Sequence, residues 1–245
     1  ILGARGYDVS RMRLFRRGID TLQFYPRTTG KAILSNRFNI HDGPVLLYAG
    51  RVSRDKNIHF LIELFRRIEK KYPQTVLIIA GDGPDLPELR RLHSKEPRIV
   101  CTGRLDHDIL PEVYSGADLF LFPSGTDTFG MAVLEAQACG LPAVVSDIGG
   151  PQEIVRPEST GSIARHDDLG DWERRVYSFL DLMRDDPARY AEIREASRLN
   201  AVTRFSWDTV METLAAGEKT DSDVSLDNEQ AAFREWKKQE RETFR

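Results

Sequence analysis

The sequence lacks the features that mark several common protein classes. Its 245 residues include only two cysteines, too few for a fold built on disulfides. No stretch approaches the roughly 20 consecutive apolar residues that a membrane-spanning helix needs. A net charge of −3 argues against a general nucleic-acid-binding surface, so we expect no nucleic-acid partner. What remains is a chain that is 40% hydrophobic, enough for a sizeable core.

Two phosphate-binding signatures and the usual metal signatures are also missing. The chain contains neither the G-x-G-x-x-G fingerprint nor the G-x-x-x-x-G-K-[ST] loop. No cluster of cysteine and histidine has metal-binding spacing, and we expect no metal and no cofactor. Cys101 and Cys139 lie in apolar runs and are predicted to be buried, which suits a reducing compartment and a cytoplasmic location. The histidines are predicted to lie at the surface: His41, His59, His93, His107 and His166.

Apolar runs alternate with helical patterns along most of the chain. Five runs are typical of buried strands: 45–50, 75–81, 98–103, 118–124 and 142–147. After the first of them, Ile58 to Ile68 follow the i, i+3, i+4, i+7 spacing of an amphipathic helix. Continuously apolar strands belong to sheets that are covered on both faces. The pattern therefore predicts an α/β fold with a Rossmann-like, doubly wound parallel sheet, followed by helices at about 169–183, 187–203 and 206–217.

The composition changes near the carboxyl terminus. Residues 218–229 are polar and acidic and are typical of a flexible linker. Residues 230–245 have the pattern of a helix that carries Phe233, Trp236 and Phe244. Two interpretations remain open for this segment, a helix that docks on another domain or subunit and a frayed terminus.

In open parallel sheets, ligands bind outside the carboxyl ends of the strands. Each of the five predicted strands is followed by a turn that contains glycine, which allows a sharp turn or a close approach of the backbone to a ligand. In the first turn, which begins at Gly50, Arg51 and Lys56 precede a predicted helix and form a candidate site for a diphosphate. The alternative is that both cations are ordinary solvated surface residues.

The turn SGTDTFG (124–130) leads into a small, apolar helix that contains one acid, Glu135. We expect this helix to begin near Thr128 or Phe129 with Asp127 as its N-cap, so that free N–H groups of its first turn face an anion. A glutamate in such a helix needs a partner. The vicinal hydroxyls of a ribose would supply two donors to its carboxylate. A salt bridge to a lysine or arginine is the alternative.

These motifs together resemble a known enzyme family. The order GRVSRDKN, GDGP, TGRL, YSGADLFLFPS and TDTFGMAVLEAQACGLPAVVSDIGGPQE is similar to that of the group 1 family of retaining, nucleotide-sugar-dependent glycosyltransferases. The similarity extends from about Gly18 to about Leu214, and the chain resembles the carboxyl-terminal, nucleotide-binding half of these enzymes. The resemblance implies the GT-B fold, in which two Rossmann-like domains face each other across a cleft.

The resemblance also implies roles for individual residues. Glu135 matches the second glutamate of the family's E-x7-E motif, which contacts the donor ribose. Asp127 stands in the place of the first glutamate, which faces the donor sugar, although its side chain is one methylene shorter. Arg51 and Lys56 match the cations that bind the diphosphate. The predicted catalytic residues are thus Asp127, Arg51 and Lys56, and the predicted donor-binding residues are Gly50, Gly103, Arg104, Thr128, Phe129, Gly130, Met131 and Glu135.

The expected activity is transfer of a sugar from a UDP- or GDP-sugar donor to an unknown acceptor, with retention and without a metal. Residues 1–17 are then a remnant of an interdomain connection, and residues 18–217 are the nucleotide-sugar-binding domain. The expected partner is a missing amino-terminal, acceptor-binding domain, without which the chain is predicted to be inactive. The resemblance leaves open a peripheral membrane association through that missing half. The alternatives are a non-catalytic nucleotide-binding module and a nucleotide-sugar isomerase or phosphorylase on the same fold.

Overall fold

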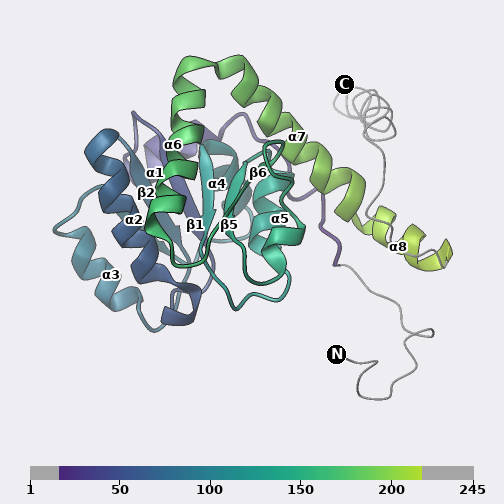
Figure 1. Cartoon of the computed structure of the whole chain (residues 1–245), viewed down its shortest axis with the longest axis horizontal. Coiled ribbons are helices and arrows are strands. Elements are labelled where there is room, and N and C mark those ends of the chain that lie inside the picture. Colours follow the sequence, from purple (N-terminus) through teal and green to yellow (C-terminus); the bar gives the residue numbers. More distant parts are fainter. Residues whose placement is uncertain (1–16, 217–245) are drawn as a thin grey trace.

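The computed structural model describes residues 17–216. The predictions made for residues 1–16 and for 218–245 lie outside this range. Within it, the chain forms a six-stranded parallel sheet with helices on both faces (Figure 1). The predicted doubly wound α/β architecture is confirmed.

The sheet has the strand order β3-β2-β1-β4-β5-β6, so the chain starts in the middle and winds first to one edge and then to the other. This order is that of a Rossmann-like sheet, and its point of reversal lies between β1 and β4. The strands are β1 (Val45–Ala49), β2 (Val76–Ala80), β3 (Ile99–Gly103), β4 (Leu119–Phe122), β5 (Ala143–Ser146) and β6 (Gly161–Ala164).

Helices cover both faces of the sheet. On one face α2 and α6 pack side by side, and on the other α4 packs against α1 and α5. Helix α7 packs along α5 and leads to α8 (Figure 1). The α-helices are α1 (Gly30–Phe38), α2 (Ile58–Lys71), α3 (Leu86–His93), α4 (Leu110–Gly116), α5 (Met131–Ala138), α6 (Leu169–Asp185), α7 (Pro187–Phe205) and α8 (Trp207–Ala216), and two short 3-10 turns are η3 (Arg54–Lys56) and η4 (Gly150–Glu153).

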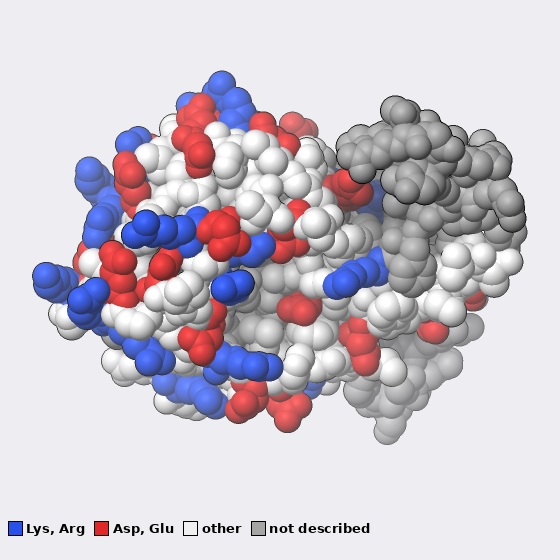
Figure 2. Space-filling view, turned by 90° about the horizontal axis from the view of Figure 1, so that it is seen from below, with Lys and Arg blue, Asp and Glu red and all other residues white. Residues whose placement is uncertain are grey.

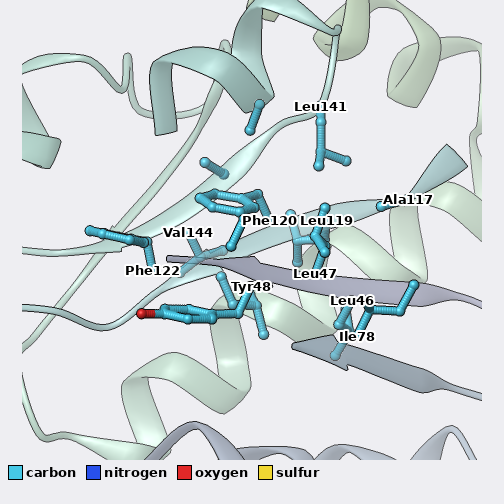
Figure 3. Packing of buried hydrophobic residues seen from close by; sticks show 14 of the residues in the cluster. Leu46, Leu47, Tyr48, Ile78, Ala117, Leu119, Phe120, Phe122, Leu141 and Val144 are labelled. Atoms are coloured by element: carbon cyan, nitrogen blue, oxygen red, sulfur yellow. The ribbon is translucent and has the colours of Figure 1, made fainter. Parts of the chain in front are cut away.

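The core is built on the central strands, whose residues are buried without alternation. Three aromatic rings of β1 and β4 lie close together: Tyr48 stacks on Phe122 with ring centroids 5.9 Å apart, and Phe120 stacks on Phe122 at 6.0 Å (Figure 3). Because both faces of a parallel sheet are covered, every side chain of such a strand enters a core. Cys139 is buried as predicted, whereas Cys101 is only half-buried in β3.

All five predicted strands are present, shortened by one to three residues. The strand that the sequence did not reveal is β6, with the sequence GSIA. It contains glycine, serine and a single large apolar residue, so it lacks the apolar run that marked the other strands. It forms one edge of the sheet, and among the described strands it pairs with β5 alone. Strand β3 lies at the other edge and was predicted from its apolar run, so the weak pattern of β6 comes from its own short sequence of mostly small residues.

Candidate functional site

The turns at the carboxyl ends of the strands pack directly on one another. A Cβ atom at Gly81 would collide with the carbonyl oxygen of Gly50, and one at Gly150 would collide with that of Thr128. The backbone of the β2–α3 turn also bonds to that of the β1–α2 turn, where Val52 N–H donates to Asp82 O at 2.9 Å. Contacts within the protein therefore account for these glycines, which are no evidence for a ligand by themselves.

Two of the predicted catalytic residues meet at this edge. Lys56 ends η3 in the β1–α2 turn, and its Nζ lies 3.3 Å from Asp127 Oδ2 in the β4–α5 turn. The same Nζ donates to Thr126 Oγ1 at 3.4 Å. Thr126 in turn donates to the carbonyl of Asp55 at 3.0 Å. The structure thus joins the two turns by a cation–carboxylate pair that is only partly exposed.

The start of helix α5 differs from the prediction. The helix begins at Met131, with Gly130 rather than Asp127 at the N-cap position and a left-handed φ of 95° there. Asp127 Oδ1 accepts the N–H groups of Gly130 at 2.7 Å and of Phe129 at 3.2 Å. As an N-cap, Asp127 was expected to accept one N–H group and to leave the others free for an anion. It accepts two, because its short side chain turns back onto both amides, so neither of them is free. The first residues of α5, Met131 and Ala132, keep N–H groups that have no acceptor within the helix.

Glu135 lies half-buried in the second turn of α5. Its Oε2 accepts a hydrogen bond of 2.9 Å from the hydroxyl of Tyr114 in α4. The protein therefore does supply a partner, and it is neither of the cations considered as an alternative. Burial raises the pKa of Glu135, while the Tyr114 hydrogen bond and the charge of His107 act to lower it. The carboxylate is held at one oxygen and is otherwise without a hydrogen-bond donor among the described residues.

The remaining predicted residues lie at the end of β3 and in the turns that follow β1 and β3. Arg51 and Arg104 are exposed, and neither forms an ion pair with any residue in the range 17–216. The carbonyl of Arg51 accepts the buried hydroxyl of Tyr48 at 2.7 Å, which fixes the turn that begins at Gly50. Gly103 ends β3 with a φ of 73°. Neither Arg51 nor Arg104 forms a hydrogen bond or ion pair with Asp127 or Glu135 in the structure.

One histidine was predicted to be a surface residue but forms part of this edge. The ring of His166 packs beside Gly125, and its Nδ1 lies 3.0 Å from Ser146 Oγ. The backbone N–H of His166 donates to Asp147 Oδ1 at 2.8 Å. His166 comes two residues after the end of β6, so its place at the carboxyl edge could not be predicted once that strand was missed. The next residue, Asp167, accepts a hydrogen bond of 2.7 Å from Asn57.

On the side of the molecule shown in Figure 2, basic and acidic side chains are interspersed with uncharged ones, and no patch of a single sign of charge is seen there.

Two aspartates in the β3–α4 loop, Asp106 and Asp108, have the Asp-x-Asp spacing of some metal sites, and both are exposed. In the described part of the chain, no three His, Cys, Asp or Glu side chains are grouped to hold a metal ion. None of the described helices is long and apolar enough to span a membrane.

Comparison with known proteins places this arrangement in a family. The family model for "Glycosyl transferases group 1" matches residues 31–198. A glycogen synthase of Mycobacterium tuberculosis is 36% identical over 172 residues, which are 69% of this chain and 41% of that protein. The sulfoquinovosyl transferase of Arabidopsis thaliana is 28% identical over 211 residues, 84% of this chain and 39% of that protein.

Solved structures agree on the fold. The sucrose-phosphate synthase of Thermosynechococcus elongatus superimposes with a TM-score of 0.71 at 28% identity, over 83% of this chain and 51% of that one. The Anabaena protein HepE in complex with UDP gives a TM-score of 0.74 at 21% identity, over 87% of this chain and 59% of that one. The chain spans about half the length of the relatives that it matches.

Proposed function

The chain belongs to the group 1 glycosyltransferases, whose members transfer sugars from nucleotide sugars, and we propose that it is the donor-binding half of a retaining enzyme. Its Rossmann-like sheet is the architecture of one half of a GT-B glycosyltransferase. The observation that carries the proposal is the pair of acids at the carboxyl edge, Asp127 beside Lys56 and Glu135 one turn into α5. This edge is where such sheets bind ligands.

The residue types at this edge suit the departure of a nucleotide. Breaking the bond between a sugar and a diphosphate develops negative charge on the leaving group. Cations and helix N–H groups that are already in place stabilise that charge. Lys56, Arg51 and the first amides of α5 are the groups proposed to do so, and they would supply this stabilisation without a metal.

Asp127 has a more restricted role in this proposal than the family pattern implies. Its two carboxylate oxygens are engaged by the amides of Phe129 and Gly130 and by Lys56. To act at the donor sugar, the carboxylate would have to leave these partners. We therefore propose that Asp127 fixes the turn and shares Lys56 with the donor diphosphate, and that direct contact with the sugar requires its displacement.

A uridine-linked donor is the first to test. HepE, which shares the fold, was crystallised with UDP and with UDP-glucose. Glu135 is proposed to accept the ribose hydroxyls, and the loop that contains Gly103 and Arg104 is proposed to contact the base. None of these groups is specific for one base by its chemistry, so a GDP-linked donor is tested in parallel.

The test of the proposed function is a binding screen of the chain with UDP-, GDP- and ADP-sugars, followed by thermal unfolding in the presence and absence of EDTA. We expect one nucleotide to raise the unfolding temperature and the shift to persist in EDTA. No shift with any of the donors would contradict the proposal. A shift that requires added Mg²⁺ would contradict the metal-independent role of Lys56 and Arg51.

Transfer itself is proposed to need the rest of the enzyme. The described candidate residues all serve the leaving nucleotide, and holding an acceptor in place supplies a large share of such a rate enhancement. The measurement is sugar transfer with mixed acceptors, by this chain alone and by the full-length protein. Efficient transfer by the chain alone would show that it is not a donor-binding half. Binding without transfer in both would favour a non-catalytic nucleotide-binding module.

A further inference from the structure

Tyr114 is a fully buried tyrosine whose ring is fixed from two sides. It projects from α4 and makes edge-on contacts with Phe24, at 6.3 Å between ring centroids, and with Phe120, at 5.7 Å. Its exposed fraction is zero. A buried ring between two others has one well-populated orientation. The position of its hydroxyl is therefore set by the core and not by the ligand site.

That hydroxyl lies against the acid proposed to recognise the donor. It donates to Glu135 Oε2 at 2.9 Å. A phenol has a single hydrogen to donate, whereas a carboxylate offers about four acceptor positions on its two oxygens. One oxygen of Glu135 is thereby held, and Oε1 has no hydrogen-bond donor among residues 17–216. A rigid donor on one oxygen also limits the rotation of the whole carboxylate group.

The surroundings of Glu135 make this contact the main one that favours its charged form. Burial raises the pKa of Glu135, and the Tyr114 hydrogen bond is the leading influence in the other direction, followed by the charge of His107 in the β3–α4 loop. Cys139, which follows the last residue of α5, also interacts electrostatically with this acid. Burial and the neighbouring Glu135 raise the pKa of Tyr114 well above its usual value. The phenol thus remains a donor throughout the neutral pH range.

We propose that Tyr114 is a positioning residue for donor recognition, which holds Oε2 of Glu135 so that Oε1 is left to accept the vicinal hydroxyls of the donor ribose. This inference rests on the proposed function. It adds a residue, Tyr114, that does not itself contact the donor but determines how well Glu135 distinguishes a ribose from a 2′-deoxyribose.

A purely structural role for the tyrosine makes a different prediction. Packing between Phe24 and Phe120 needs only the ring, and a phenylalanine would fill the same space. The hydroxyl is the part that meets Glu135, so Tyr114→Phe removes the positioning contact and keeps the packing. A matched control is Tyr190→Phe, because Tyr190 is also buried and its hydroxyl donates to the carbonyl of Asp118 at 2.6 Å, away from Glu135.

The experiment compares the affinities of the chain for UDP, GDP and ADP and for their 2′-deoxy forms, by calorimetry between pH 6 and pH 8. The wild-type chain should prefer the ribonucleotide. Tyr114→Phe should lower that preference by about three- to tenfold, within the net worth of one ordinary hydrogen bond, because Tyr114 acts on the donor only through Glu135. The loss should be larger at pH 6 than at pH 8, because Glu135 without its donor takes up a proton more readily. Tyr190→Phe should keep the wild-type preference at every pH.

A second variant tests whether the effect passes through the acid. In a Glu135→Gln background, Tyr114→Phe should produce no further change in the preference. A preference that is unchanged in Tyr114→Phe, or lowered equally in Tyr190→Phe, would overturn this inference while leaving the proposed function intact. A wild-type chain that binds none of the three ribonucleotides would overturn the proposed function, and this inference with it.

Discussion

The β4–α5 turn contains Asp127 and the second turn of α5 contains Glu135, but the two carboxylates differ in how many of their oxygens the protein engages. Asp127 is bound by two backbone amides and by Lys56. Glu135 is bound by one tyrosine hydroxyl and lies in surroundings that raise its pKa. The first carboxylate is satisfied by the protein, and the second is held but has acceptor capacity left over.

This difference indicates that the carboxylate of Asp127 stabilises the protein and that the carboxylate of Glu135 is available to bind a ligand. A carboxylate whose oxygens are all engaged contributes to the shape of its turn, and a ligand must compete for it. A half-buried carboxylate with an unoccupied oxygen costs folding free energy unless something binds it. We therefore expect substitutions at Glu135 to change recognition and substitutions at Asp127 to change mainly the local structure. Lys56 lies between the two roles because it pairs with Asp127 and is the proposed diphosphate ligand.

The largest effect is expected for Lys56→Ala. Removing this cation should weaken the binding of a nucleoside diphosphate by about ten- to a hundredfold, the loss of one charge-assisted contact. The measurement is calorimetry with UDP and GDP. Lys70→Ala is the control, because Lys70 is an exposed lysine at the far end of α2. An unchanged dissociation constant in Lys56→Ala would remove Lys56 from the site and would leave it only as the partner of Asp127.

The next effect concerns recognition by Glu135. Glu135→Gln should abolish most of the preference for ribo- over 2′-deoxynucleotides, a change of about tenfold for a lost charge-assisted hydrogen bond. The amide keeps the size of the side chain and can still accept from Tyr114, so the change isolates the charge. Competition binding with matched nucleotide pairs measures it. If the variant discriminates as the wild type does, the assignment of Glu135 to the ribose is wrong.

The sequence predicted the sheet better than it predicted the partners of these two acids. The apolar runs of the central strands are long because those strands are covered on both faces, whereas β6 at the edge has the short pattern GSIA and was missed. Because β6 was missed, the position of His166 at the carboxyl edge of the sheet was missed as well. Tyr114 precedes Glu135 by 21 residues along the chain, and its contact depends on how α4 packs on α5. The N-cap pattern predicted the return of Asp127 onto its own turn, but it did not predict the later helix start at Met131 or the second amide N–H that Asp127 accepts.

A third prediction uses pH to test the cost of Glu135. Because burial raises the pKa of Glu135 in the folded protein, ionising this residue costs folding free energy. The cost is absent below the ordinary pKa of 4.5 and grows as the pH rises through the folded value. Glu135→Gln has no such cost. Without ligand, it should therefore unfold at a higher temperature than the wild type at pH 8, and the difference should shrink as the pH falls towards 5.

Thermal unfolding followed by circular dichroism between pH 5 and pH 8 measures this difference. The control is Glu88→Gln, since Glu88 is an exposed glutamate in α3. Its substitution should shift the unfolding temperature by a similar amount at every pH. A pH-independent difference for Glu135→Gln as well would show that Glu135 is solvated like any surface acid, and the contrast with Asp127 would then disappear.

The smallest effect is expected for Asp127→Asn, and it decides what Asp127 does. An asparagine can keep Oδ1 as the acceptor for Gly130 N–H, which in the wild type is 2.7 Å away, but it loses the ion pair with Lys56. A partly exposed pair of this kind is worth about 0.2–1 kcal/mol. Stability should therefore fall only slightly, whereas Asp127→Ala, which also removes the acceptor, should cost about 1–2 kcal/mol.

In Asp127→Asn, Lys56 no longer has its ion-pair partner, so it should bind the diphosphate about two- to threefold more tightly, again within the worth of such a pair. Transfer by the full-length protein distinguishes the two roles of Asp127. If Asp127→Asn tightens donor binding and still transfers sugar, Asp127 only stabilises the turn. If the variant binds donor normally but loses transfer by several orders of magnitude, the carboxylate leaves the turn to act at the sugar, contrary to our expectation.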